Sequence, residues 1–206
     1  MKQYAPVIGI CRHRLQTDGE GVSTLIAFHG CPLRCRYCLN PQSLEREEDW
    51  DKYDCATLYE KARIDELYFL ATRGGVTFGG GEPCLRSEFI RDFRQFCGKD
   101  WLLTLETSLN VPQRHIECLL PVIDRYIVDI KDMNPDIYLR YTNRDNANVL
   151  HNLRFLIEQN RADNITVRIP LIPEYNTEKD RKRSIRQLEA LGLSRFDLFT
   201  YKTFKT

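Results

Sequence analysis

The sequence lacks a hydrophobic run long enough to cross a membrane, because no stretch approaches the ~18 apolar residues that a spanning helix needs. Its first ten residues have neither the long apolar segment nor the small-residue cleavage site of a signal peptide. An excess of one charge is also missing, since 30 Lys and Arg residues against 29 Asp and Glu leave +1, without a polybasic run. We therefore expect a cytoplasmic protein that binds neither nucleic acid nor a membrane.

Internal repeats, low-complexity tracts and an interdomain linker are missing as well. The chain has 206 residues, of which 42% are hydrophobic and 29% charged, which is ordinary for a globular protein with a real core. We expect a single domain over residues 1–206.

What the sequence does contain is eight cysteines. In a cytoplasmic chain, cysteines are better interpreted as ligands and core thiols than as a disulfide framework. The scattered ones are expected to be small buried hydrophobes: Cys11, Cys55, Cys84, Cys97 and Cys118.

The remaining three, Cys31, Cys35 and Cys38, follow a C-x3-C-x2-C spacing that is too tight for structural disulfides and well sized for one metal centre. The usual iron–sulfur cubane takes four cysteines. Three close ligands without a fourth nearby suggest a cluster with one open iron, which can bind a substrate. Three alternatives remain: a zinc site completed by His29, buried free thiols, or one face of a helix. Flanking glycine and proline residues favour a loop over the helix.

Short β-branched or aromatic runs alternate with amphipathic stretches, which is typical of βα units on a parallel sheet. The expected strands are residues 24–28, 75–78, 102–107, 125–131, 165–170 and 196–201. Helices are expected near 54–70, 87–97, 149–157 and 177–191, and residues 43–52 are expected to be a polar linker or a short helix. Six such units predict an α/β fold in the form of an open, partial (β/α)6 barrel that lacks the last helix.

Candidate ligand-binding residues follow these strands, at the edge where βα barrels collect their sites. Gly79, Gly80, Gly81 and Glu82 follow the second strand, and the glycines allow a close backbone approach to a ligand. Asp129 and Lys131 lie two apart on the fourth strand, so both would point into the barrel while Ile130 packs outward. These two charges could form an ion pair or bind a ligand. Neighbouring strands add Thr104, Glu106 and Ser108, and Thr166 and Arg168.

The cysteine spacing, with Tyr37 before the third cysteine, resembles the signature of radical S-adenosylmethionine (SAM) enzymes. The Gly-Gly-Glu-Pro run at 80–83 resembles the motif of that superfamily that binds the amino group of SAM. The run Asp-Ile-Lys-Asp-Met-Asn at 129–134 and the lead-in at 17–22 are similar to elements of glycyl-radical-enzyme activating enzymes, although Glu20 and Ser23 depart from the lead-in pattern.

The resemblance implies that Cys31, Cys35 and Cys38 hold one [4Fe–4S] cluster and that Gly80, Gly81 and Glu82 line the methionine pocket of SAM. Asp129 and Lys131 would contact the ribose and carboxylate of SAM. Lys202 stands where the family has a histidine that touches SAM. The remaining residues expected at the cofactor are Tyr37, Leu39, Glu106, Ile130 and Arg168. No side chain is expected to be catalytic by itself, because the chemistry is centred on the cofactors.

The implied function is reductive cleavage of SAM to a 5′-deoxyadenosyl radical that takes a hydrogen from a glycine of a glycyl radical protein. Flavodoxin or ferredoxin would supply the electron. Two alternatives are a radical SAM enzyme that modifies a small molecule or peptide and a non-catalytic metal-binding module.

Overall fold

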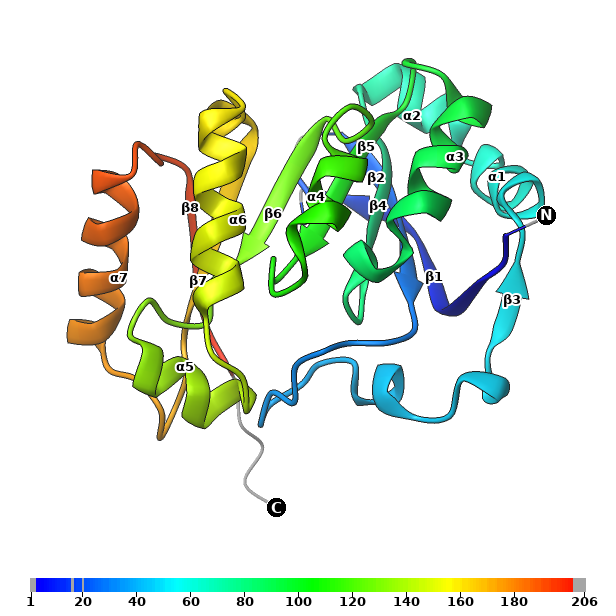
Figure 1. The fold of residues 1–206 in the computed structure, drawn as a ribbon. Coiled ribbons are helices and arrows are strands. Elements are labelled where there is room, and N and C mark those ends of the chain that lie inside the picture. Colours follow the sequence, from blue (N-terminus) through cyan, green and yellow to red (C-terminus); the bar gives the residue numbers. More distant parts are fainter. Residues whose placement is uncertain (1–2, 16, 20, 202–206) are drawn as a thin grey trace. The chain divides into compact units, whose positions relative to one another are not determined.

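A computed structural model describes residues 3–15, 17–19 and 21–201 (Figure 1). Its contacts divide the chain into two compact units that alternate along the sequence. Unit 1 contains residues 1–31, 40–107 and 114–126, and unit 2 contains residues 32–39, 108–113 and 127–206. The single domain expected from the sequence stays a prediction.

The sheet of unit 1 has the strand order β3-β1-β2-β4-β5. β1 runs antiparallel to β2 and β3, whereas β2, β4 and β5 are parallel. The strands are β1 (Ala5–Leu15), β2 (Val22–Phe28), β3 (Asp51–Tyr53), β4 (Gly75–Gly80) and β5 (Leu102–Thr107). β2 and β4 are almost wholly buried, as expected for central strands of a parallel sheet.

Helices cover the strands of unit 1, and α1 and α3 lie side by side (Figure 1). α3 buries Phe89, Ile90 and Phe93, and the ring of Phe93 packs edge-on against Phe78 of β4 at 5.4 Å. Burial of each such side chain stabilises the fold by about 1.5–3 kcal/mol. The elements are α1 (Cys55–Arg63), α2 (Glu66–Thr72), α3 (Ser87–Cys97), α4 (Gln113–Leu119) and the 3-10 turns η1 (Pro41–Leu44), η2 (Glu47–Asp49) and η3 (Pro83–Arg86).

In unit 2, β6 (Arg125–Asp129, whose first two residues are assigned to unit 1), β7 (Ile165–Leu171) and β8 (Phe196–Thr200) follow one another in the sheet. The helices are α5 (Pro135–Thr142), α6 (Ala147–Glu158) and α7 (Glu178–Ala190), with a 3-10 turn η4 (Ala162–Asn164). α7 begins with a capping box, in which Thr177 and Asp180 each satisfy a backbone N–H of the other.

All six predicted strands are present, as are the four predicted helical regions. The region 54–70 forms two helices, α1 and α2, rather than one, because the chain breaks at Asp65. Residues 43–52 contribute to η1, η2 and β3. β1, α4 and α5 were not predicted, and β6 ends at Asp129 rather than at residue 131. No helix in the described ranges is long and apolar enough to cross a membrane.

Asp65, at the break between α1 and α2, is fully buried and joins three elements. Its carboxylate accepts hydrogen bonds from Nε of Arg12 at 2.8 Å and from Oγ1 of Thr24 at 2.7 Å, and lies 2.9 Å from Nε2 of His13. Burial alone would raise the pKa of Asp65, but the hydrogen bonds and the charge of Arg12 outweigh burial and lower it.

We expect Asp65→Asn to reduce the free energy of unfolding by about 2 kcal/mol at pH 7, because the charge-assisted hydrogen bonds lose their acceptor charge. Because the pKa of Asp65 is lower in the folded than in the unfolded protein, its carboxylate stabilises the fold at pH values above the unfolded pKa. This stabilisation is lost as pH falls through the folded pKa. The difference from the wild type should therefore shrink below about pH 4. Urea unfolding at several pH values measures it, with the exposed Asp100→Asn as control. An equal difference at every pH would contradict the prediction.

Candidate active site

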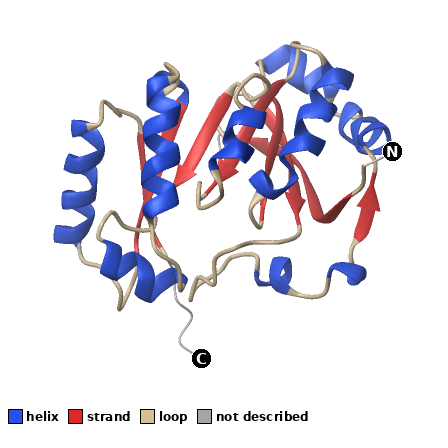
Figure 2. Cartoon of the chain, in the orientation of Figure 1, coloured by secondary structure: helices blue, strands red, loops and turns tan. Residues whose placement is uncertain are grey.

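The cysteine-containing segment, residues 29–40, forms neither helix nor strand, so the loop predicted from its glycine and prolines is confirmed (Figure 2). Cys31, Cys35 and Cys38 are free thiols of intermediate exposure. Cys31 belongs to unit 1, whereas Cys35 and Cys38 belong to unit 2. In the described part of the chain, no group of three His, Cys, Asp or Glu residues is arranged to hold a metal, so the ligand role of these cysteines stays a prediction.

Backbone hydrogen bonds fix the loop within each unit. In unit 1, the N–H of Gly30 donates to Ser43 at 2.9 Å, and Nε2 of His29 lies 2.9 Å from the carbonyl oxygen of Glu45. In unit 2, the N–H groups of Arg34 and Arg36 donate to the carbonyls of Thr142 and Tyr141, at the end of α5. The contact with Glu45 gives His29 a structural role that does not need a metal.

The glycine segment at the end of β4 packs its backbone directly against the start of the cysteine loop. The N–H of Gly81 donates to Phe28 at 2.9 Å, and the N–H of Glu82 donates to Gly30 at 2.7 Å. Gly80 has φ +94°, and a Cβ there would lie 2.8 Å from Cα of Ala27. A Cβ on Gly81 would overlap the carbonyl oxygen of Gly30. Both positions therefore require glycine.

Glu82 is 1% exposed, yet its carboxylate is well supported within unit 1. Oε1 accepts a hydrogen bond from Oγ1 of Thr107 at 2.6 Å and another from the N–H of Cys84 at 3.2 Å. Thr107, at the end of β5, orients this carboxylate and was not predicted as a site residue. Its position at the carboxyl end of a parallel strand is the signal that could have identified it.

We expect Gly81→Ala to lower the free energy of unfolding by at least about 2 kcal/mol, because the added methyl collides with backbone that cannot move aside without breaking the hydrogen bond of Glu82. Gly9→Ala is the matched control, because a Cβ at Gly9 has nothing within 4 Å. Thermal and urea unfolding of both variants measures the effect. Equal stability of the two variants would show that the segment at Gly81 is not held as tightly as the contacts indicate.

Lys131, just after β6, is the best-buried cation among the described residues of unit 2, at 7% exposure. Its ammonium group pairs with Oδ2 of Asp129 and donates to Oη of Tyr201 at 3.1 Å. Burial would lower the pKa of Lys131, but the charge of Asp129 outweighs it and raises the pKa. The other oxygen of Asp129, Oδ1, is buried and accepts no hydrogen bond from the described residues. The ion pair is thus present, and it leaves an acceptor for a ligand.

Aromatic rings surround this pair in unit 2. Tyr141 and Tyr201 are buried together with Ile172, and the side chains packed against them are Cys35, Tyr37, Tyr175 and Phe199. Burial raises the pKa of Cys35 to about 11, although the charge of Lys131 works in the opposite direction. Cys35 is therefore a thiol at neutral pH, and metal binding would displace its proton. Sequence reasoning missed this aromatic cluster because its tyrosines come from separate segments.

The other predicted site residues lie in several different environments. The side chain of Glu106 lies next to Gly79. The pKa of Arg14 is raised mainly by Asp18, and the charge of Glu106 adds to this effect. Nε of Arg168 lies 3.1 Å from Oδ2 of Asp197 on β8. Ile130 is 1% exposed, and its N–H donates to the carbonyl of Arg168. Leu39 is 74% exposed, and Lys202 lies outside the described residues.

The chemical types of these residues suit the two cofactors expected from the sequence. Three thiols are the donor type that iron–sulfur clusters take. The orphaned Oδ1 of Asp129 can accept a hydrogen bond from a hydroxyl group such as that of a ribose.

The chain matches the model of the Radical SAM superfamily over residues 25–188. It is 30% identical to the (2S)-3-sulfopropanediol dehydratase activating enzyme of Klebsiella oxytoca, over 78% of this chain and 69% of the relative. It is 31% identical to the pyruvate formate-lyase-activating enzyme of Staphylococcus aureus, over 79% and 67% of the two chains.

The solved structure of Streptococcus suis SuiB bound to S-adenosylmethionine is similar with a TM-score of 0.66 and 14% identity. The match covers 87% of this chain and 42% of that one, so this chain spans less than half of SuiB, and the likeness concerns the fold alone. It confirms the α/β partial-barrel fold predicted from the sequence. The family match and the two activating-enzyme relatives show that the chain belongs to the radical SAM superfamily, enzymes that use a [4Fe–4S] cluster and SAM.

Proposed function

We propose that this protein activates a glycyl radical enzyme. In this reaction SAM is cleaved reductively to methionine and a 5′-deoxyadenosyl radical, which takes a hydrogen atom from the Cα of a glycine in the partner. The products are 5′-deoxyadenosine and a glycyl radical. The activating enzymes among its relatives, at 30% and 31% identity, support this choice within the superfamily.

The observation that carries the proposal is the arrangement around Lys131 in unit 2. The buried ammonium group of Lys131 donates to Tyr201, and the thiol of Cys35 packs against the same aromatic cluster. Asp129, which pairs with that ammonium group, has one oxygen without a hydrogen-bond donor among the described residues. In the proposal Lys131 binds the carboxylate of SAM, and Asp129 accepts a hydrogen bond from its ribose. The rings of Tyr37, Tyr141 and Tyr201 exclude water, which strengthens both interactions.

The residues of unit 1 have complementary roles in the proposal. Gly80 and Gly81 let the backbone approach the methionine half of SAM, and Glu82 binds its amino group. Thr107 holds the carboxylate of Glu82 in place through the 2.6 Å hydrogen bond. Cys31, Cys35 and Cys38 hold the cluster, which supplies the electron when reduced. We propose a flavodoxin or ferredoxin as the physiological reductant and the cytoplasm as the location, where all eight free cysteines stay reduced.

The experiment uses anaerobically reconstituted, chemically reduced protein with SAM, and 5′-deoxyadenosine and methionine are quantified by chromatography. Pyruvate formate-lyase and sulfopropanediol dehydratase are then added separately, and the glycyl radical is sought by electron paramagnetic resonance. A radical on either partner supports the proposal. SAM cleavage with no radical on any glycyl radical protein would instead favour modification of a small molecule or peptide. A protein that binds zinc and cleaves no SAM would be a metal-binding module.

A further inference from the structure

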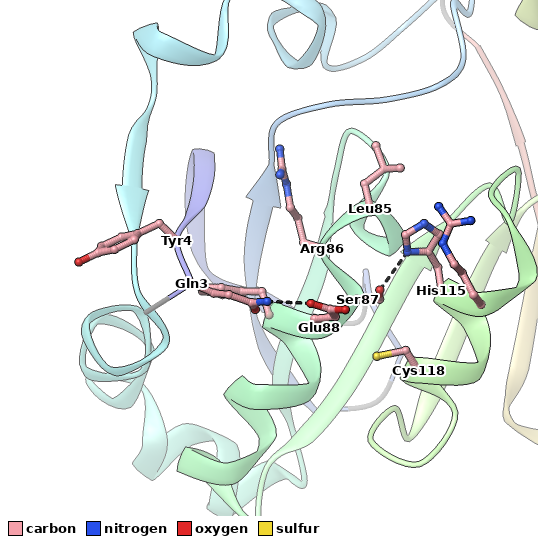
Figure 3. Close-up of a pocket in the computed structure, with 10 residues that line it drawn as sticks. Gln3, Tyr4, Leu85, Arg86, Ser87, Glu88, His115 and Cys118 are labelled. Atoms are coloured by element: carbon pink, nitrogen blue, oxygen red, sulfur yellow. Dashed lines mark hydrogen bonds between the residues drawn. The ribbon is translucent and has the colours of Figure 1, made fainter. Parts of the chain in front are cut away.

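Unit 1 contains a pocket that none of the proposed roles uses (Figure 3). It is a cavity of about 370 Å³ beside the junction of η3 and α3. Tyr4, Leu85 and Phe89 give it an apolar wall, and Gln3 donates to Oε2 of Glu88 at 2.8 Å on one side. The remaining lining residues carry polar or charged groups: Arg86, Ser87, Arg114, His115 and Cys118.

Three hydrogen-bond donors of this pocket have no acceptor among the described residues. Arg114, on α4, makes neither a hydrogen bond nor an ion pair there, and Nε of Arg86 is buried without a partner. Nδ1 of His115 lies 3.0 Å from Oγ of Ser87, whereas its Nε2 has no partner. When the hydroxyl of Ser87 donates to Nδ1, Nε2 carries the hydrogen and becomes the third donor.

The charges of the pocket favour an anion. The charge of Arg86 is partly balanced by Glu47, whose Oε2 lies 3.2 Å from its Nη2. Glu88 contributes one negative charge, and its carboxylate accepts a hydrogen bond from Gln3. Arg114, whose side chain is exposed, makes no ion pair with the described residues. An oxyanion that accepts from Arg114 and from Nε2 of His115 would replace water on the first and give the second an acceptor.

We propose that this pocket binds a small carboxylate or phosphate anion, held by Arg114 and Nε2 of His115, with Ser87 fixing the imidazole. The apolar wall of Tyr4, Leu85 and Phe89 would take a short organic body attached to the anion. None of the proposed SAM residues lines this pocket, so the proposal does not depend on the proposed function.

Binding should be linked to the protonation of His115. Burial first, and then the charge of Arg114, lower the pKa of His115, while Glu82 and Glu88 act in the opposite direction. The remaining titratable groups around the pocket are Tyr4, Arg86 and Cys118. A bound anion would offset Arg114 and raise the pKa, so by linkage the anion binds more tightly as pH falls through the pKa of His115.

The experiment follows the histidine ring signals by NMR while inorganic phosphate or acetate is added at constant ionic strength. The chain has only four histidines, so His115→Gln assigns the signal. We expect a saturable shift of the His115 signal, and Arg114→Gln should weaken binding about tenfold or more, the value of one charge-assisted hydrogen bond. Arg154→Gln, an exposed arginine on α6 that does not line the pocket, is the matched control.

A larger affinity for phosphate or for acetate assigns the anion class, and either supports the site. The proposal is overturned if neither anion gives a saturable shift, or if Arg114→Gln and Arg154→Gln weaken binding equally. Both variants lie at exposed helix positions and should keep the wild-type urea midpoint. The measurement needs no reduced cluster and no SAM, so its failure is distinct from a failure of the proposed activity.

Discussion

Replacing Cys35 with alanine is expected to reduce the formation of 5′-deoxyadenosine from SAM to background. The three cysteines of the loop have no fourth cysteine nearby in the sequence, so the loss of one leaves too few thiolates to hold an iron–sulfur cluster. Cys35 also packs against the aromatic cluster that contains Tyr141 and Tyr201, and the charge of Lys131 acts on its thiol.

The measurement has two parts: iron content with visible absorbance after reconstitution, and chromatographic product analysis after reduction. Cys11→Ala is the matched control, because Cys11 is an exposed cysteine on β1. It should keep the wild-type iron content and activity. Normal SAM cleavage by Cys35→Ala would refute the ligand role of Cys35. A loss of folding is excluded by comparing the circular dichroism of the two variants without metal.

The parallel strands could be predicted from the sequence because their buried residues form continuous apolar or β-branched runs. β1 could not, since Ala5–Leu15 is an antiparallel strand that leaves the core after Val7 and carries Arg12, His13 and Arg14 in its outer half. The break between α1 and α2 was missed for a similar reason. Aspartate costs a helix interior less than about 1 kcal/mol by propensity, so Asp65 alone does not mark a break in the sequence. Its contacts with Arg12 and Thr24 are what the fold adds at that position.

In the candidate site, too, some features could be predicted from the sequence and others could not. The glycines at 80 and 81 could be predicted because nearby backbone excludes a side chain at both positions, so the sequence must have glycine there. The support for Glu82 by Thr107, and the pairing of Ser87 with His115, depend on which side chains the fold brings together. Threonine, serine and histidine occur in many environments, so their local sequence does not predict the contacts of Thr107 with Glu82 and of Ser87 with His115.

The second large effect is expected at Asp129. Asp129→Asn should lower the free energy of unfolding by about 3 kcal/mol, because it leaves the buried ammonium group of Lys131 without its counter-charge. Lys131→Met should cost less, since the side chain of Asp129 is 22% exposed and can be hydrated. The double variant should recover most of the stability, because it removes both charges.

Urea unfolding of the wild type, the two single variants and the double variant gives the coupling energy between Asp129 and Lys131. The control is Glu178→Gln, which removes an exposed glutamate that pairs with Arg181 and should change stability by no more than about 0.5 kcal/mol. The pKa of Lys131 is raised in the folded protein, so its contribution is complete below the unfolded value of about 10.4 and is lost only as pH rises through the folded value. The coupling should therefore be the same at pH 6 and pH 9. Additive effects of the two substitutions would show that the pair contributes nothing.

The same double variant separates the two roles that Asp129 and Lys131 could have. If they form only a structural ion pair, restoring stability should restore SAM cleavage as well. If they bind SAM, the stable double variant should still show no 5′-deoxyadenosine, because the ammonium group is gone and residue 129 has lost the negative charge of its carboxylate. We expect the second result, since an ion pair needs only one carboxylate oxygen, and Asp129 keeps the other one buried and without a donor in the described part of the chain.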